Sequence, residues 1–202
     1  MRALSLVAVF ASLLFAEEYV RPNLSLKPFN AVIKNTAASA LPAASLAKTN
    51  TIEQFAKVYA ASEVEFENLK AVTLAMMLLE SGRGTSDLAK KYNNFGGLKY
   101  RPEMAAMAKK IRYYASDGYD YYCHFASFES FIAGFWTFLD RKPYEGWRTK
   151  ALDERKFLEF IAPIYCPYNS DYANSVMKLL PEARALLAKH VGGGYRVAAI
   201  KE

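Results

Sequence analysis

The sequence predicts a mainly α protein with one small β-hairpin. Residues 71–79, apolar apart from Thr73, form a run of helix-favouring residues that contains too few β-branched side chains for a strand. Residues 128–141 place large apolar side chains at helical spacing behind a serine. Between these helices, two segments rich in aromatic side chains, 111–114 and 119–125, flank an Asp-Gly pair, which is a strong hairpin signal.

Length and composition indicate one globular domain with appendages. The chain has 202 residues, of which 52% are hydrophobic, so it can bury a real core and is not a disordered protein. Its formal net charge is +6. The basic residues form no arginine-rich or lysine-rich cluster, so we expect no nucleic-acid partner. A modest positive charge suits an anionic envelope polymer or lipid surface.

The first 50 residues differ in composition from the rest. Residues 1–16 combine an early arginine, an apolar run and small residues, which is typical of a secretory signal peptide. Residues 17–50 read as a flexible leader, residues 51–190 as the folded domain and residues 191–202 as a loose tail. The protein is therefore expected to be exported to the periplasm, cell envelope or medium. Membrane contact is expected only through an uncleaved signal.

Helix caps fix most of the remaining elements. Thr51 and Gln54 form a capping box at the start of a helix. Thr85 or Ser86 caps a short helix over residues 87–91, and Ser127 caps the helix over residues 128–141. A last helix, residues 171–188, is expected to bend or break near its proline.

Glu80 is the leading candidate for a catalytic residue. It stands at the end of the apolar run and is followed by Ser-Gly-Arg-Gly, in which two glycines stop the helix. The negative end of the helix dipole and the apolar neighbours both disfavour its ionised form. A raised pKa is what a general acid needs near neutral pH. The alternative is a solvated glutamate at a helix end.

The segment after Glu80 resembles a known family. Glu80-Ser81-Gly82-Arg83-Gly84-Thr85-Ser86, then Leu88-Ala89-Lys90 and Asn93-Asn94-Phe95-Gly96-Gly97-Leu98-Lys99, are similar to the signature of glycoside hydrolase family 73, the cell-wall β-N-acetylglucosaminidases. The resemblance extends over about residues 51–187. It implies a lysozyme-like helical domain whose hairpin lines the substrate groove, and it implies that Glu80 is the catalytic acid.

The same resemblance implies further site residues. Asp171-Tyr172-Ala173 matches the family's Tyr-Ala motif, in which the tyrosine lies near the acid, so Tyr172 is a second catalytic candidate. Asn94 and Phe95 are expected to line the floor of the groove. On the hairpin, Tyr114 and Tyr122 are candidates for stacking on sugars, although side chains alternate between the two faces of a strand.

The sequence does not decide the identity of the second catalytic group. The family often uses a hairpin carboxylate, but the matching position here is Tyr114. Asp117 and Asp120 are the nearest hairpin carboxylates, and we take Asp117 as the candidate, with a turn aspartate that bonds its own backbone as the alternative. A water attacking in an inverting mechanism and the substrate's own N-acetyl oxygen are both compatible with this sequence.

Cys123 and Cys166 are the only cysteines, and in an exported protein they are expected to form a disulfide between the hairpin and the loop before the last helix. A cysteine peptidase is disfavoured, because Cys123 and His124 are strand neighbours that point to opposite faces. A zinc site would need His190 near the tail as well as both cysteines. We expect neither a metal nor another cofactor.

These features predict a monomeric, exported hydrolase that cleaves the β-1,4 bond after N-acetylglucosamine in the glycan strands of peptidoglycan. Two alternatives stay open. One is a lytic transglycosylase or muramidase that acts on the same substrate. The other is a catalytically weak cell-wall-binding protein, an alternative that the absence of a glutamate at the hairpin position supports.

Overall fold

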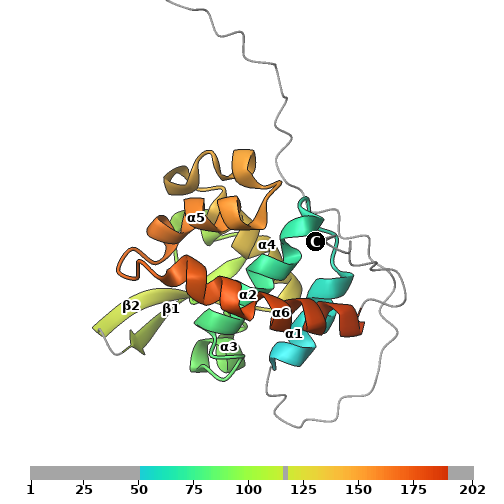
Figure 1. Ribbon diagram of the computed structural model, residues 1–202. Coiled ribbons are helices and arrows are strands. Elements are labelled where there is room, and N and C mark those ends of the chain that lie inside the picture. The colour runs from blue at the N-terminus through green and yellow to red at the C-terminus, as the bar shows by residue number, and fades with distance from the viewer. Residues whose placement is uncertain (1–50, 116–117, 191–202) are drawn as a thin grey trace, which may run out of the picture. The chain divides into compact units, whose positions relative to one another are not determined.

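The computed structural model describes residues 51–115 and 118–190 (Figure 1). The signal peptide predicted for residues 1–16, the leader over residues 17–50, the tail over residues 191–202 and the candidate Asp117 lie outside the described residues. Within them, the mainly α class with one antiparallel hairpin is confirmed. No helix of the described part is long and apolar enough to span a bilayer.

Helices dominate the chain on both sides of the hairpin. The α-helices and strands are α1 (Ile52–Ala61), α2 (Lys70–Glu80), α3 (Asp87–Tyr92), β1 (Ala108–Ala115), β2 (Gly118–Phe125), α4 (Phe128–Leu139), α5 (Glu154–Tyr165) and α6 (Tyr172–His190). Short 3₁₀ turns connect them: η1 (Glu67–Leu69), η2 (Pro102–Met104), η3 (Lys142–Tyr144) and η4 (Trp147–Lys150).

The central element is α2. Every residue from Lys70 to Leu78 is buried, as the apolar run predicts. The helix packs against α6, which crosses it in Figure 1, and against α1. The burial of α2 ends in its last turn, where Leu79 and Glu80 are only partly buried.

The predicted caps are confirmed. Thr51 accepts a hydrogen bond from the Gln54 N–H, and the Gln54 side chain accepts one from the Thr51 N–H. At the start of α4, Ser127 and Ser130 form the same reciprocal pair. These caps satisfy backbone N–H groups that helix starts leave unpaired, and so they fix where α1 and α4 begin.

An aromatic core joins α1, α4 and the turn after α3. The Phe55 ring stacks on Phe95 with centroids 4.7 Å apart, and Phe131 meets Phe55 edge-on at 5.4 Å. Trp136, assigned to the core from sequence, is 6% exposed. Offset and edge-to-face arrangements of this kind add to the burial of apolar area.

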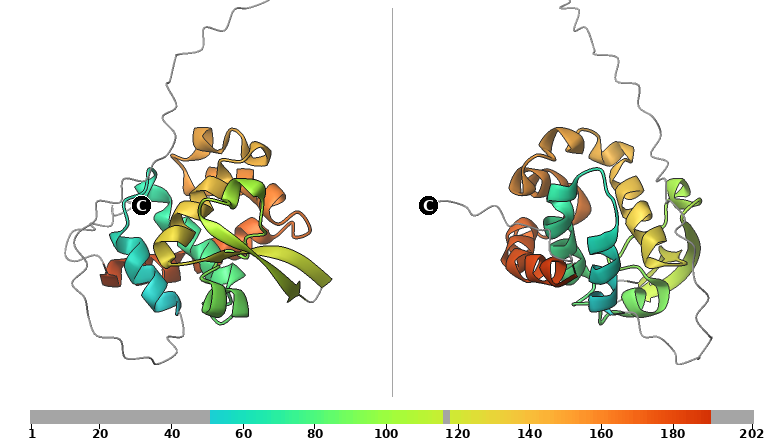
Figure 2. Two further views of the ribbon diagram at one scale, coloured as in Figure 1. Left: turned by 180° about the vertical axis from the view of Figure 1, so that it is seen from behind. Right: turned by 90° about the vertical axis from the view of Figure 1, so that its right-hand side faces the viewer.

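The hairpin pairs β1 with β2 in antiparallel register, with Ile111 opposite Tyr122, Tyr113 opposite Asp120 and Tyr114 opposite Tyr119. In the segment before it, Lys99 forms an isolated antiparallel bridge to Tyr122, outside the two-stranded sheet. Figure 1 and the reverse view in Figure 2 show the hairpin extending away from the helices, on the same side as the connection between α5 and α6.

Two helices differ from the prediction. Helix α5 was not predicted, although Asp153 caps it and its buried side chains recur at helical spacing. Helix α6 runs without a break through Pro181, so the break that was one of the two predicted outcomes does not occur. A proline removes only one backbone donor from the helix, and the buried Leu180 and Ala183 on either side hold it against the core.

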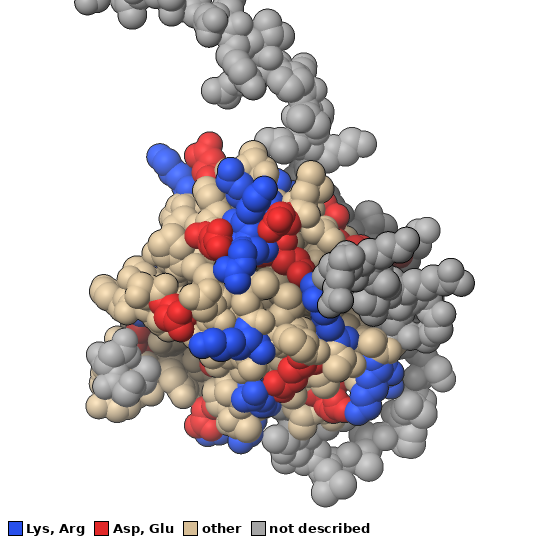
Figure 3. All heavy atoms as spheres, viewed as in Figure 1, with Lys and Arg blue, Asp and Glu red and all other residues tan. Residues whose placement is uncertain are grey.

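The surface carries interspersed charges of both signs on the face shown in Figure 3. Several ion pairs join different elements, such as Arg83 with Glu182 and Arg184 with Glu154. Exposed pairs of this type contribute about 0.2–1 kcal/mol each, so they orient the elements more than they stabilise the fold.

Candidate active site

Glu80 is the last residue of α2 and, like Leu79 before it, is only partly buried, whereas Lys70 to Leu78 are buried. The chain then makes a tight turn in which Gly82, Arg83 and Gly84 all have positive φ. A side chain on Gly84 would meet the Ile52 backbone nitrogen at 2.8 Å. The two turn glycines therefore end α2 and let the turn pack closely on α1, which leaves Glu80 at the surface of the core.

Burial raises the pKa of the Glu80 carboxyl, and the nearby Tyr172 side chain lowers it by a smaller effect. The raised pKa predicted from sequence is thus confirmed, with desolvation as the main cause. A carboxyl with this property holds a proton at a higher pH than an exposed glutamate does. It can therefore donate that proton to a leaving oxygen.

Tyr172 lies beside Glu80, as predicted. It is the first residue of α6 and is 2% exposed. Its hydroxyl is buried and makes no hydrogen bond of acceptable geometry within the described residues, yet it is close enough to Glu80 to affect its pKa. Burial raises the pKa of this tyrosine well above its ordinary value, so the hydroxyl stays protonated and is available as a donor.

Tyr165, at the end of α5, supports the same site. Its hydroxyl donates a hydrogen bond of 2.6 Å to the Gly96 carbonyl, and its ring centroid lies 5.9 Å from that of Tyr172. The pKa of Tyr165 is raised by burial and by the nearby charge of Glu80. No role for Tyr165 was predicted from the sequence.

The glycine pair after Phe95 brings the backbone close to the acid. Gly97 has a φ of +59°, and a Cβ placed there would lie 3.8 Å from the Glu80 Oε2 atom. A Cβ on Gly96 would meet the Tyr165 hydroxyl at 2.9 Å. The turn therefore forms one side of the site, and glycine allows the close approach.

Asn94 and Phe95 shape this turn from inside, which corrects the prediction that they line the groove floor. The Asn94 amide donates to the carbonyls of Leu98 and Cys123, and its oxygen accepts from the Leu98 N–H. The Asn94 residue is 1% exposed and Phe95 is 0% exposed. Both side chains are fully engaged in the core, so neither presents atoms to a substrate.

The hairpin register places Tyr114 and Tyr122 on opposite faces, so they cannot line one groove together. Tyr122 is 8% exposed and shares its face with Tyr113, whose ring packs against Tyr92 of α3. Tyr114 is 66% exposed on the other face. The Tyr122 ring packs within the hairpin face that is turned to α3, and its role as a substrate contact stays a prediction.

No second carboxylate of the described chain perturbs the pKa of Glu80. Asp120 lies on the hairpin face turned to α3, where its carboxylate forms an ion pair of 2.7 Å with Lys99 that lowers its pKa. Asp117 lies outside the described residues, and its role stays a prediction.

The cysteines are both free, so the predicted disulfide is absent from the structure. Cys123 is 0% exposed and lies beneath the hairpin, where burial raises the pKa of its thiol to about 12. Cys166 caps the end of α5 and lies near Glu80, whose charge raises its pKa together with burial. The two side chains thus belong to different surroundings, one in the core and one beside the acid.

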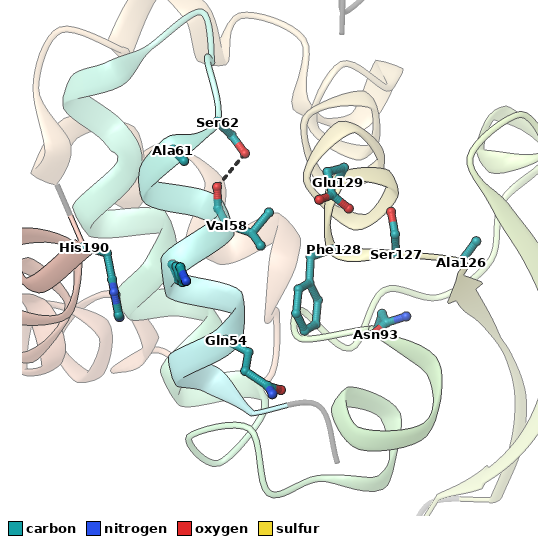
Figure 4. A pocket seen from close by; sticks show the side chains of 11 residues that line it. Gln54, Val58, Ala61, Ser62, Asn93, Ala126, Ser127, Phe128, Glu129 and His190 are labelled. Atoms are coloured by element: carbon teal, nitrogen blue, oxygen red, sulfur yellow. Dashed lines mark hydrogen bonds between the residues drawn. The ribbon is translucent and has the colours of Figure 1, made fainter. Parts of the chain in front are cut away.

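A hollow of about 900 Å³ lies elsewhere, between α1 and the start of α4 (Figure 4). Its polar side chains serve local structure: Ser127 caps α4, Ser62 donates to the Val58 carbonyl, and Asn93 donates to the Phe125 carbonyl. Neither Glu80 nor Tyr172 is among its walls, so the hollow is separate from the acid.

The comparisons with known proteins identify the family of the chain. Residues 52–184 match the family model described as Glucosaminidase, mannosyl-glycoprotein endo-beta-N-acetylglucosaminidase. The chain belongs to this family. The match includes the turn after α2 and the start of α6, and so contains both Glu80 and Tyr172. The helical domain with one hairpin is accordingly the lysozyme-like fold expected of a glucosaminidase.

The solved structures include one similar chain, the catalytic domain of the autolysin Auto from Listeria monocytogenes. It has 20% sequence identity and a TM-score of 0.45, and the match covers 75% of this chain and 91% of that one. A search of the curated proteins gave no match. Family membership supports a glycoside hydrolase that acts on peptidoglycan.

Proposed function

We propose that the protein is an exported endo-β-N-acetylglucosaminidase that cleaves the β-1,4 bond after N-acetylglucosamine in peptidoglycan. Glu80 is its general acid. The observation that supports this role is the placement of a partly exposed carboxyl, whose pKa is raised by burial, at the end of a buried helix and beside a buried tyrosine hydroxyl. Export rests on residues 1–16, whose composition is that of a signal peptide.

In this reaction the Glu80 carboxyl gives its proton to the glycosidic oxygen as the bond to the anomeric carbon breaks. The positive charge that develops on the sugar ring needs a second group. The substrate's own N-acetyl oxygen can fill this role, since it can attack the anomeric carbon from within the sugar. This route asks the protein for one carboxyl and for a donor that orients the acetamido group.

Tyr172 fits the role of that donor. Its buried hydroxyl has no hydrogen-bond partner of acceptable geometry in the described chain and lies next to Glu80. A buried hydroxyl without a partner costs free energy unless a ligand completes it. We therefore favour the substrate-assisted route over an inverting one, in which Asp117 would activate a water. The anomer formed first distinguishes them: proton NMR shows the β anomer for the former and the α anomer for the latter.

Product analysis tests the bond that is cut. Purified peptidoglycan is digested and its fragments are analysed by mass spectrometry. The proposal predicts fragments with N-acetylglucosamine at the reducing end. Anhydro-muramic ends would indicate a lytic transglycosylase, and muramic acid at the reducing end a muramidase. Binding to peptidoglycan without any new reducing ends would indicate a wall-binding protein.

A further inference from the structure

The two faces of the hairpin differ in charge. The face turned to α3 carries Asp120, which pairs with Lys99 at 2.7 Å. The opposite face carries two cations, Lys110 and Arg112, and no carboxylate among the described strand residues. Both cations are exposed, and neither forms an ion pair with a residue of the described chain. Within the described residues, positive charge is thus collected on one side of the hairpin without a counterion on that face.

These cations rest on exposed tyrosine rings of the facing strand. The Lys110 ammonium lies 3.9 Å from the centroid of Tyr121, and the Arg112 guanidinium lies 4.1 Å from that of Tyr119. The Tyr119 ring in turn packs against Tyr114 with centroids 4.8 Å apart. Cation–π contact of this kind holds each charged group against an exposed ring.

The exposure of the three rings has no structural explanation in the fold. Tyr114 is 66% exposed, Tyr119 is 65% exposed and Tyr121 is 46% exposed. A cluster of large exposed side chains is uncommon on a soluble domain and often marks a binding surface. We call this surface the tyrosine–cation face, made up of Lys110, Arg112, Tyr114, Tyr119 and Tyr121.

The tyrosine–cation face continues toward Glu80. Tyr100 donates its backbone N–H to the Tyr121 carbonyl, and its ring centroid lies 5.9 Å from the Lys110 ammonium. Tyr100 follows Gly97 by three residues, and Gly97 is the point at which the backbone approaches the Glu80 carboxyl. A polymer bound at Glu80 and extending along this segment would therefore reach the face.

We propose that the tyrosine–cation face binds the carboxylates of the stem peptides carried by the glycan strand that Glu80 cuts. This inference rests on the proposed function and adds to it a preference for glycan strands that carry stem peptides. Sugars stack on exposed tyrosine rings, and ammonium and guanidinium groups pair with carboxylates. A peptide-bearing glycan supplies both kinds of group on one polymer, whereas a neutral N-acetylglucosamine polymer supplies only the sugars.

The test compares two forms of one substrate. Soluble peptidoglycan strands are used as isolated, or after their carboxyls have been converted to neutral amides with carbodiimide and ammonia. For wild-type protein, neutralisation should raise KM roughly five- to tenfold, the effect expected of two exposed ion pairs. The double variant Lys110→Gln/Arg112→Gln should show the same KM for both forms. Strands stripped of their stem peptides by an amidase should behave like the neutral form.

The control variant Lys109→Gln/Lys156→Gln removes two exposed lysines, one on the other hairpin face and one on α5. It has the same net charge as the test variant and should keep the wild-type preference. Equal KM values for the two substrate forms with wild-type protein would overturn the proposal. A KM for amidase-stripped strands as low as that for native strands would also overturn it. The muramic acid carboxylate, and not the stem peptide, would then be the group recognised.

Binding separates this proposal from the proposed function. Co-sedimentation of Glu80→Gln protein with insoluble peptidoglycan needs no catalysis. Affinity of the Glu80→Gln protein should fall roughly five- to tenfold when the peptidoglycan carboxyls are neutralised. Replacing Lys110 and Arg112 in the Glu80→Gln protein should lower its affinity for native peptidoglycan by the same factor, and neutralisation should then have no further effect. If the preference is present but wild type releases no fragments, the proposed function fails and the face does not. If the protein bound anionic lipid vesicles without glycan as tightly as it binds peptidoglycan, the tyrosine–cation face would not be a stem-peptide site.

Discussion

The Tyr172 hydroxyl lies beside the Glu80 carboxyl and lowers its pKa, while burial raises it by a larger effect. The two residues come from distant parts of the chain, one from the end of α2 and the other from the start of α6. The long contact between these helices therefore sets the distance between the proposed acid and the proposed donor.

Replacing Tyr172 with phenylalanine separates the effect of its hydroxyl on the pKa of Glu80 from the effect of burial. Without the hydroxyl the pKa of Glu80 rises further, so the alkaline limb of the pH–rate profile should move to higher pH. Activity at the optimum should fall about tenfold or more through the loss of one hydrogen bond to the sugar. Stability near neutral pH should fall slightly, because the hydroxyl no longer favours the ionised form of the Glu80 carboxyl.

Tyr59→Phe is the matched control for Tyr172→Phe. The Tyr59 hydroxyl is buried and bonds the Thr73 hydroxyl at 2.7 Å, far from the acid in the packing of α1 on α2. Its loss should cost about 1 kcal/mol of stability and leave the pH–rate profile in place. An unchanged profile in Tyr172→Phe would contradict the proposed contact.

Asn94→Ala tests the correction made for that residue. The change removes three hydrogen bonds to buried backbone groups and leaves those groups unpaired. We expect a loss of about 2–4 kcal/mol in the free energy of unfolding, measured by urea denaturation. A variant of wild-type stability with a raised KM would instead support the substrate contact predicted from sequence.

Gly97→Ala probes the approach of the backbone to the acid. At a φ of +59° alanine is strained by about 1 kcal/mol, and its methyl group would lie 3.8 Å from the Glu80 carboxylate. Gly118→Ala is a suitable control, since its φ is +116° and nothing lies within 4 Å of the added atom. Both variants should lose stability, but only Gly97→Ala should lose activity; equal activities would place the substrate elsewhere.

The raised pKa of Glu80 also predicts how stability depends on pH. The folded state favours the protonated carboxyl, so its contribution is present below the unfolded pKa and is lost as pH rises through the folded pKa. Glu80→Gln avoids that loss. It should be more stable than wild type near neutral pH, by on the order of 1 kcal/mol, with the gap closing toward pH 4. A gap in melting temperature that is constant with pH would contradict this.

Local rules in the sequence predicted the elements that depend on neighbours in the chain. The capping pairs at Thr51 and Ser127, the end of α2 at Glu80 and the hairpin turn each follow from residues a few positions apart. The position of the acid follows from the same kind of rule, because a charged residue at the end of an apolar helix conflicts with its local surroundings.

What the sequence did not predict depends on contacts between distant segments. A shift of one residue in hairpin register exchanges the faces, so sequence alone did not decide between Tyr114 and Tyr122. The burial of Phe95, in the turn after α3, depends on Phe55 from α1 and Phe131 from α4. The role of Tyr165 depends on its bond to a carbonyl 69 positions away.

The central claim is that Glu80 is the general acid, and one comparison tests it most directly. Release of reducing ends from purified peptidoglycan is measured for wild type, Glu80→Gln and Glu63→Gln, the last being an exposed glutamate with the same change. Glu80→Gln should be slower by about 10²–10⁴-fold at full stability, and Glu63→Gln should match wild type. Digestion by Glu80→Gln at the wild-type rate would contradict the claim.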